Sequence, residues 1–189
     1  MKSSPSFTIF CGPMFSAKTS SLLLMLEKYK HQHKRVALFK PTIDDRYSTG
    51  EVVTHGGWKM QAHCVKTGAD ILESLSEIEH HPHVVAVDEA FMIPGAAETL
   101  IWLFKQGFSV VVSSLELSAT GKPFQELEKM MVWATRIKKC TAVCTVCGQD
   151  AYYTHKKLLG GVGEIEVGGS ELYEPRCAYH FPEAFEGIT

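Results

Sequence analysis

Residues 12–19 decide the fold, and they read Gly12-Pro13-Met14-Phe15-Ser16-Ala17-Lys18-Thr19. An apolar run at 7–11 precedes them and a leucine-rich run at 22–26 follows, so we expect strand, loop and helix in that order. Such a loop surrounds phosphate oxygens with backbone N–H groups and aims a helix N-terminus at them. In this arrangement Lys18 reaches the β and γ phosphates, and the hydroxyl of Thr19 is a Mg²⁺ ligand. The stretch therefore predicts an ATP-type phosphate loop.

Ala17 is the one departure from the loop motif, which has a second glycine at that position. A methyl group is tolerated there if the φ angle of the residue is negative or if the loop shifts slightly. The alternative interpretation is an ordinary turn between a strand and a helix. The strand and helix patterns on both sides favour the phosphate loop.

The composition indicates a globular protein with a real core. The chain has 189 residues, of which 45% are hydrophobic and 21% charged, which suits one domain with a small appendage. The net charge of −2, without a cluster of Lys and Arg, argues against a nucleic-acid-binding surface. No apolar run approaches the length of a membrane span or a signal peptide core, so we expect no membrane association and a cytoplasmic location.

Strand and helix patterns alternate along the chain. The segment 42–66 has no sustained periodicity and is expected to be a long loop with a short strand near Val52. This alternation is typical of an α/β fold with a parallel sheet covered by helices on both faces. The predicted helices cover residues 19–34, 71–78, 94–106 and 124–134, and the predicted strands cover 7–11, 35–40, 84–87 and 108–115, with a last short strand at Ile137.

Asp88 and Glu89 directly follow the apolar strand predicted at 84–87. Open α/β sheets bind their ligands at the carboxyl ends of parallel strands. The two carboxylates therefore form a second signal for phosphate chemistry.

The last quarter of the chain carries a metal-site pattern. Cys144 and Cys147 are separated by two residues, and Cys177 and His180 repeat that spacing. Two such pairs suit tetrahedral Zn²⁺, which is structural when protein groups fill all four positions. Cys140 and His155 are rival ligands, and the remaining alternative is that Cys177 and His180 are ordinary core and surface residues.

The change in composition after the last predicted strand suggests two units. Residues 1–139 would form the nucleotide-binding α/β domain, and 140–189 a zinc-binding subdomain. The glycine pairs at 160–161 and 168–169 indicate a loop that the metal pins at its base.

Together these motifs resemble the zinc-containing cytosolic (type II) thymidine kinases, over residues 7–180. The resemblance implies a P-loop NTPase-like sheet with a zinc-binding lasso subdomain that closes over the substrate. It also implies a homotetramer that uses Mg²⁺ and ATP to phosphorylate thymidine to dTMP, in nucleotide salvage for DNA synthesis. The motifs that carry it are the stretch 12–19, the run 44–48 (Asp-Asp-Arg-Tyr-Ser), Val87-Asp88-Glu89, Lys122-Pro123-Phe124, Cys144 with Cys147, Gly168-Gly169 with Tyr173, and Cys177 with His180.

The resemblance also assigns roles to single residues. Glu89 would be the general base for the 5′-hydroxyl, and Asp88 would hold Mg²⁺ together with Thr19. Asp44 and Arg46 would border the phosphates, although they also suit a surface ion pair. The loop residues Gly12, Pro13, Met14, Phe15, Ser16, Ala17, Lys18 and Thr19 would bind the phosphates of ATP. Thymidine would lie among Met14, Leu115, Ala119, Phe124, Thr154, Ile165, Glu166, Val167, Gly168 and Tyr173.

Several departures from the family pattern surround the expected active site. Besides Ala17, they are Phe91 and Met92 after Asp88-Glu89-Ala90, Ala119 in place of an aromatic residue, and a connection at 119–121 without the usual arginine. They leave three alternatives to a thymidine-specific enzyme: a deoxynucleoside kinase of altered specificity, a zinc-bearing P-loop ATPase, and a non-catalytic nucleotide-binding relative.

Overall fold

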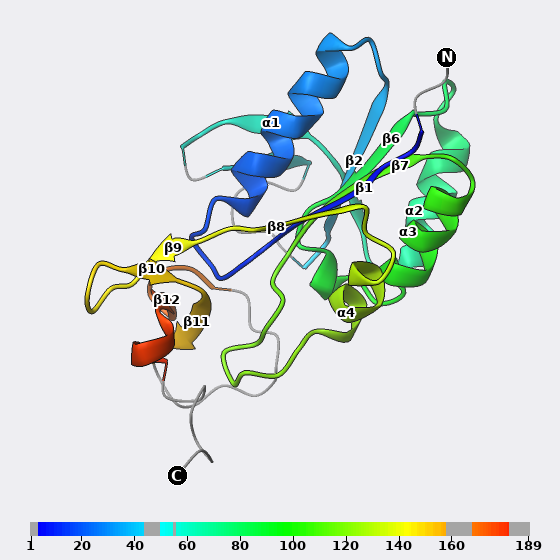
Figure 1. The fold of residues 1–189 in the computed structure, drawn as a ribbon. Helices are drawn as coiled ribbons and strands as arrows, with labels where there is room; N and C mark the ends of the chain where they lie inside the picture. The colour runs from blue at the N-terminus through cyan, green and yellow to red at the C-terminus, as the bar shows by residue number, and fades with distance from the viewer. Residues whose placement is uncertain (1–3, 44–49, 55, 158–167, 182–189) are drawn as a thin grey trace.

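A computed structural model describes residues 4–43, 50–54, 56–157 and 168–181 of the chain. Its centre is a six-stranded sheet in the order β5-β2-β6-β7-β1-β8 (Figure 1). Every neighbouring pair in this sheet is parallel, as the alternation of strands and helices predicts. The strands are β1 (Phe7–Cys11), β2 (Val36–Pro41), β5 (His63–Val65), β6 (Val84–Val87), β7 (Ser109–Ser114) and β8 (Arg136–Lys139).

Helices cover both faces of the sheet. Helix α1 (Lys18–His31) lies on one face, and α2 (Gly68–Glu77), α3 (Ala96–Lys105) and α4 (Gln125–Met131) lie on the other (Figure 1). The short 3₁₀ turn η1 (Ala90–Met92) follows β6, and a second one, η2 (Ala178–His180), follows β12 (Tyr173–Arg176). The expected α/β architecture is confirmed.

The alternation of side chains along the strands builds a core on each face. In β1, Phe7 and Ile9 point into the cluster shared with α2, α3 and α4. Phe10 points to the opposite face, where Leu22 and Leu26 of α1 pack against it. Because successive side chains of a strand point to opposite faces, a strand that is apolar throughout needs cover on both sides.

The segment 42–66 contains more regular structure than predicted. Strands β3 (Glu51–Val53) and β4 (Lys59–Gln61) form an antiparallel pair, and β5 joins the edge of the main sheet beside β2. Strands of three residues are too short to show periodicity, and β5 owes its place to pairing with Phe39, Lys40 and Pro41.

The bounds of the predicted helices differ from the observed ones by up to three residues. Helix α1 ends at His31, because His33 takes a positive φ of 57° and the chain turns towards β2. Leu72 belongs to the predicted apolar stripe of α2, but it is 38% exposed, whereas Ile71 and Leu75 are buried. Differences of a few residues between predicted and observed helix bounds are common, because hydrogen bonding is incomplete at helix ends.

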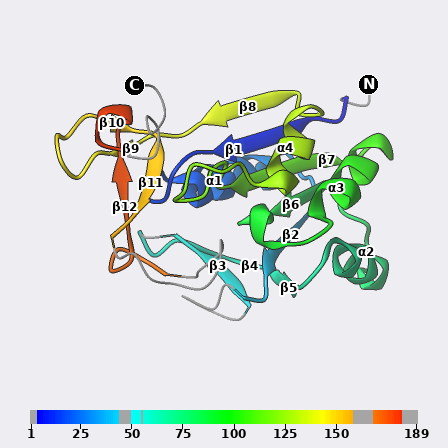
Figure 2. The same ribbon diagram turned by 90° about the horizontal axis from the view of Figure 1, so that it is seen from below.

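The chain after β8 forms two small antiparallel pairs beside the phosphate loop (Figure 2). Strand β9 (Ala142–Val143) pairs with β10 (Asp150–Ala151), and β11 (Tyr153–Lys156) pairs with β12 (Tyr173–Arg176). Within the part of the chain that the structure describes, no helix is both long and apolar enough to cross a membrane.

Candidate active site and metal centre

The loop between β1 and α1 has the backbone geometry of an anion cradle. Gly12 has a φ of 139°, and Phe15 and Ala17 have left-handed φ angles of 65° and 57°. Ala17, the N-cap residue of α1, makes no side-chain hydrogen bond to the first turn, so the N–H groups of that turn can bind a ligand. The loop and the helix start together offer donors to a phosphate chain.

Ala17 does not have the negative φ angle that would accommodate a methyl group without strain. Its φ of 57° and ψ of 31° place it in the left-handed region, as the N-cap of α1. That conformation costs a residue with a Cβ about 1–2 kcal/mol. Strain of this kind collects at functional sites, where the surrounding structure holds it in place.

Lys18 is buried at the bottom of the loop. Its ammonium group donates a hydrogen bond to the carbonyl oxygen of Pro13 at 2.6 Å. Burial lowers the pKa of Lys18, while the carboxylates of Glu89 and Asp88 act in the opposite direction. The ammonium group is thus held inside the loop by a contact that a phosphate oxygen can replace.

The first carboxylate after β6 meets the phosphate loop directly. The hydroxyl of Thr19 lies 3.1 Å from each carboxylate oxygen of Asp88, which is 5% exposed. Ser113, from β7, donates a second hydrogen bond to the same carboxylate. Three neighbouring elements, α1, β6 and β7, therefore determine where this acidic group points.

Ser113 is a site residue that the sequence analysis missed. It lies near the end of β7, which is parallel to β6, so the rule that singled out Asp88 applies to it as well. The polar pair Ser113-Ser114 at the end of an otherwise apolar strand was the available signal.

Glu89 borders the phosphate loop. An open cavity of about 60 Å³ is lined by the loop residues 14–19 together with Glu89. The residue has a left-handed φ of 50° and begins the turn η1, so the backbone changes direction directly after Asp88. The two consecutive carboxylates accordingly have different surroundings: Asp88 contacts Thr19, and Glu89 faces the cavity.

Two contacts organise the region where the base of a nucleoside is expected. The backbone N–H of Met14 donates to the hydroxyl of Thr154 at 3.0 Å, which joins the phosphate loop to β11. The rings of Phe91 and Phe124 lie 4.5 Å apart at an interplanar angle of 41°. Phe91 therefore supplies an aromatic surface beside the loop that carries Ala119.

The structure describes some of the expected site residues and omits others. Tyr173 is the first residue of β12, which pairs with β11, the strand that carries Thr154, and Gly168 lies on the chain that leads into β12. Leu115 and Ala119 are half-buried on the connection after β7. Asp44, Arg46, Ile165, Glu166 and Val167 lie outside the described residues.

Three cysteines and one histidine converge near the end of the chain. One ligand atom from each of Cys144, Cys147, Cys177 and His180 lies within 4.8 Å of the other three. The Sγ atoms of Cys147 and Cys177 are 3.7 Å apart, and Nδ1 of His180 is 3.2 Å from Cys177 Sγ and 3.8 Å from Cys144 Sγ. Tetrahedral Zn²⁺ with ordinary bond lengths separates its ligand atoms by about 3.4–3.8 Å.

The chemistry of this group also suits zinc. Burial raises the pKa of the Cys144 thiol, but the backbone N–H groups of Cys177, Val146 and Cys147 outweigh that effect and lower it to about 6. A thiol of this kind is ready to bind metal as thiolate near neutral pH. The rival ligands Cys140 and His155 are not members of the group, and Cys140 packs in the apolar cluster under α1.

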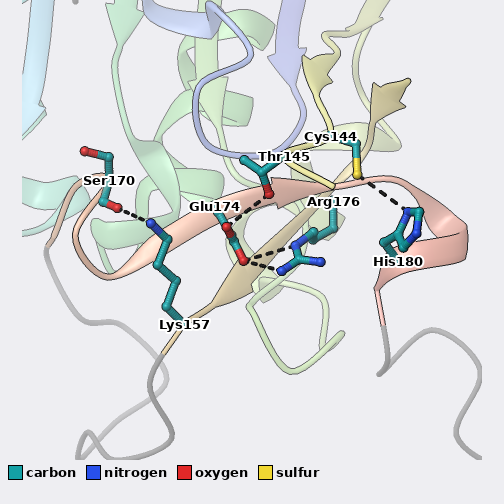
Figure 3. Close-up of polar contacts among 7 residues, drawn as sticks. All are labelled: Cys144, Thr145, Lys157, Ser170, Glu174, Arg176 and His180. Atoms are coloured by element: carbon teal, nitrogen blue, oxygen red, sulfur yellow. Dashed lines mark hydrogen bonds and ion pairs between the residues drawn. The ribbon is translucent and has the colours of Figure 1, made fainter. Parts of the chain in front are cut away.

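A polar clamp, formed by Thr145, Glu174 and Arg176, ties the metal group to β12 (Figure 3). The Thr145 hydroxyl, between the first two cysteines, donates to Glu174 at 3.0 Å, and Nε of Arg176 donates to the same carboxylate at 3.1 Å. Between the end of β11 and the start of β12, the ammonium group of Lys157 donates to the Ser170 carbonyl oxygen at 2.7 Å. The metal group and the strand pair that holds Thr154 are thus one connected unit.

Comparison with known proteins gives two findings. The model of the family described as "Thymidine kinase" matches residues 5–181. The chain is also similar to a curated thymidine kinase of the archaeon Thermococcus kodakarensis, with 38% identity over 180 residues, which cover 91% of each chain.

Proposed function

The chain belongs to the thymidine kinase family, and from this premise we propose how its residues transfer the γ-phosphoryl group of ATP to the 5′-hydroxyl of thymidine. The observation that carries the proposal is the pair of carboxylates after β6. Asp88 contacts Thr19 of the phosphate loop, and Glu89 faces the cavity of that loop. Phosphoryl transfer needs one acidic group for the metal and one for the attacking hydroxyl.

The phosphate loop binds ATP through backbone N–H groups of residues 12–19 and the N-terminus of α1. Lys18 exchanges the carbonyl oxygen of Pro13 for a phosphate oxygen when the nucleotide arrives. Thr19 and Asp88 would hold Mg²⁺, which neutralises charge on the phosphate oxygens when it is bound with ATP. The support for this assignment is the 3.1 Å contact between the two side chains.

Glu89 accepts the proton of the 5′-hydroxyl as the oxygen attacks the γ-phosphorus. The support for this role is that Glu89 lines the same cavity as the phosphate-loop residues 14–19. A positioned general base typically contributes about 10²- to 10⁴-fold to the rate.

The base of thymidine binds between the phosphate loop and β11, where Met14 and Thr154 meet. Phe124 forms one wall, and its ring packs against the ring of Phe91. Phe91 compensates for the missing aromatic side chain at Ala119, so the pocket keeps a flat apolar surface for a pyrimidine. The family residues Asp44, Arg46, Ile165, Glu166 and Val167 complete the site in this proposal.

Several further features belong to the proposal through the family resemblance. They are a homotetramer, a cytoplasmic location, and a division into a domain of residues 1–139 and a zinc-binding subdomain of residues 140–189. Light scattering on the purified protein tests the tetramer directly.

The decisive experiment compares Glu89→Gln with the wild type. We expect phosphorylation of thymidine to fall by at least about 100-fold, while ATP binding measured by calorimetry changes less than about twofold. Glu128→Gln, on the exposed side of α4, is the matched control and keeps full activity. Unchanged turnover in the Glu89 variant would refute the role of the base.

A nucleoside panel tests the specificity. Wild-type protein is offered thymidine, deoxyuridine, deoxycytidine and deoxyguanosine, with a sample lacking nucleoside to detect bare ATP hydrolysis. Selective formation of dTMP supports the proposal. Preference for another nucleoside would show a pocket of different shape, and hydrolysis without nucleoside would favour an ATPase.

A further inference from the structure

An ion pair outside the expected site links strand β8 to the connection after β7. The ammonium group of Lys139 lies 2.7 Å from a carboxylate oxygen of Glu116. The Glu116 side chain is only 12% exposed and that of Lys139 is 48% exposed, whereas in the surface pair Lys129 is 47% and Glu98 is 62% exposed. The two pairs therefore differ at the carboxylate, and because the Glu116 carboxylate is largely buried, solvent screens its pair with Lys139 less than it screens a pair exposed at both ends.

The titration behaviour of the neighbours agrees with a close contact. Partial burial lowers the pKa of Lys139, but the adjacent carboxylate of Glu116 outweighs this effect and the net shift is upward. Burial and the adjacent Glu116 carboxylate raise the pKa of the Cys11 thiol to about 12. Cys11, the last residue before the phosphate loop, lies opposite Lys139 in the register of β1 and β8.

Lys139 contacts the zinc-binding part of the chain as well. Its ammonium group lies 5.7 Å from the ring centre of Tyr152, which precedes β11. The next residue along the chain, Cys140, donates its N–H to the Cys11 carbonyl oxygen at 2.7 Å. The lysine is therefore placed where β8, the start of the phosphate loop and β11 come together.

Glu116 opens the loop that carries Ala119 and leads to Phe124. Two backbone hydrogen bonds join the two arms of this loop. The N–H of Phe124 donates to the Glu116 carbonyl oxygen at 3.1 Å, and the N–H of Ser118 donates to the Lys122 carbonyl oxygen at 2.8 Å. The side chain of Glu116 reaches outward from this closed loop to Lys139. The ion pair thus ties the loop to the edge of the sheet.

We propose that Glu116 is a positioning residue for the nucleoside, acting through Lys139 to hold the 116–124 loop at a set distance from the phosphate loop. This inference rests on the proposed function, because the loop carries the expected wall of the base pocket. The phosphate loop itself keeps its backbone bond between Cys140 and Cys11 when the side-chain pair is removed. Loss of the pair therefore affects the nucleoside more than ATP.

The test uses Glu116→Gln and Lys139→Met, which remove one charge each while keeping side-chain length. We expect the KM for thymidine, and its dissociation constant from calorimetry without ATP, to rise about tenfold. The KM for ATP stays within about twofold in both variants. Lys139→Met has the larger effect, since it leaves a carboxylate largely buried and without its cation.

Two controls separate positioning from general stability. The double variant E116Q/K139M leaves no unpaired carboxylate at position 116. It should therefore recover part of the thymidine affinity that Lys139→Met loses. Glu98→Gln removes the carboxylate of the exposed pair and leaves both KM values unchanged.

The outcomes are distinct. Wild-type protein that does not phosphorylate thymidine contradicts the proposed function itself. Active wild type with unchanged thymidine KM in both single variants overturns the positioning role, and so does an equal rise in both KM values. If Lys139→Met does not fold, the KM values of Glu116→Gln for thymidine and for ATP decide whether the positioning role holds.

Discussion

The carbonyl oxygen of Cys140 occupies the place where any residue other than glycine at position 12 would carry its Cβ. A Cβ built on Gly12 would lie 2.2 Å from that oxygen, and the φ of Gly12 is 139°. The contact lies between the start of the phosphate loop and the chain that leaves β8. The first glycine of the motif therefore has two roles: it belongs to the phosphate loop, and it allows the backbone at Cys140 to pack closely against that loop.

Gly12→Ala is expected to destabilise the protein by about 3 kcal/mol or more, because neither backbone can withdraw without breaking the bond between Cys140 and Cys11. Urea denaturation measures the loss. Gly148→Ala is the matched control, since Gly148 also has a positive φ, of 72°, but a Cβ there meets nothing within 4 Å. The control should lose only about 1–2 kcal/mol. Equal losses would mean that backbone conformation, and not the contact with Cys140, sets the requirement.

Ala17→Gly is expected to stabilise the protein by about 0.5–1 kcal/mol, because relief of the left-handed strain exceeds the added entropy of the unfolded chain. Thermal melting and urea denaturation both report it. Ala69→Gly, in the first turn of α2, should have the opposite sign. A destabilised Ala17 variant would show that the methyl group makes a contact that offsets the strain.

Thr154→Val removes the acceptor for the Met14 N–H while keeping the shape of the side chain. Since Thr154 is 4% exposed, the stranded donor should cost about 1–3 kcal/mol. We also expect a higher KM for thymidine, because β11 loses its link to the phosphate loop. Thr154→Ser keeps the hydroxyl and should retain most of the affinity. If the valine variant matched the wild type in stability and in the KM for thymidine, the hydrogen bond between Met14 and Thr154 would not be needed for either.

His180→Ala is expected to lower the zinc content of the purified protein, measured by elemental analysis after dialysis. The reason is the loss of one of four converging ligands. His155→Ala tests the rival ligand and should leave the zinc content unchanged. Zinc loss in the His155 variant alone would assign the site differently.

The capping box of α2 predicts a pH-dependent stability. Backbone N–H groups of Lys66 and Thr67 and the Thr67 hydroxyl lower the pKa of Asp70. A carboxylate with a lowered folded-state pKa stabilises the protein above its usual pKa, and the contribution is lost as the pH falls through the lowered value. Asp70→Asn should therefore melt earlier than wild type at neutral pH, and the difference should vanish in acid. A constant difference across this range would contradict the role of the charge.

Most of the fold could be predicted because its signals are local. Strand β6 was expected at 84–87 and lies there, since a short apolar run followed by two carboxylates has few other interpretations in an α/β chain. The convergence of Cys144, Cys147, Cys177 and His180 into a group that could hold zinc was also expected, because the spacing of such ligands can be read from the sequence. Strand β5 was missed, because three residues carry too little pattern and the partner strand decides their conformation.

The sequence by itself determined the phosphate loop, the alternation of strands and helices, and the identity of the metal-binding group, because each depends on residues close together in the chain. Only the tertiary structure decided the left-handed conformation of Ala17, the hydrogen bond from Ser113 to Asp88, and the pair of Glu116 and Lys139. The contact of Met14 with Thr154 joins residues 140 positions apart. Such contacts depend on which strands become neighbours and in what register, and no local pattern of side chains encodes that.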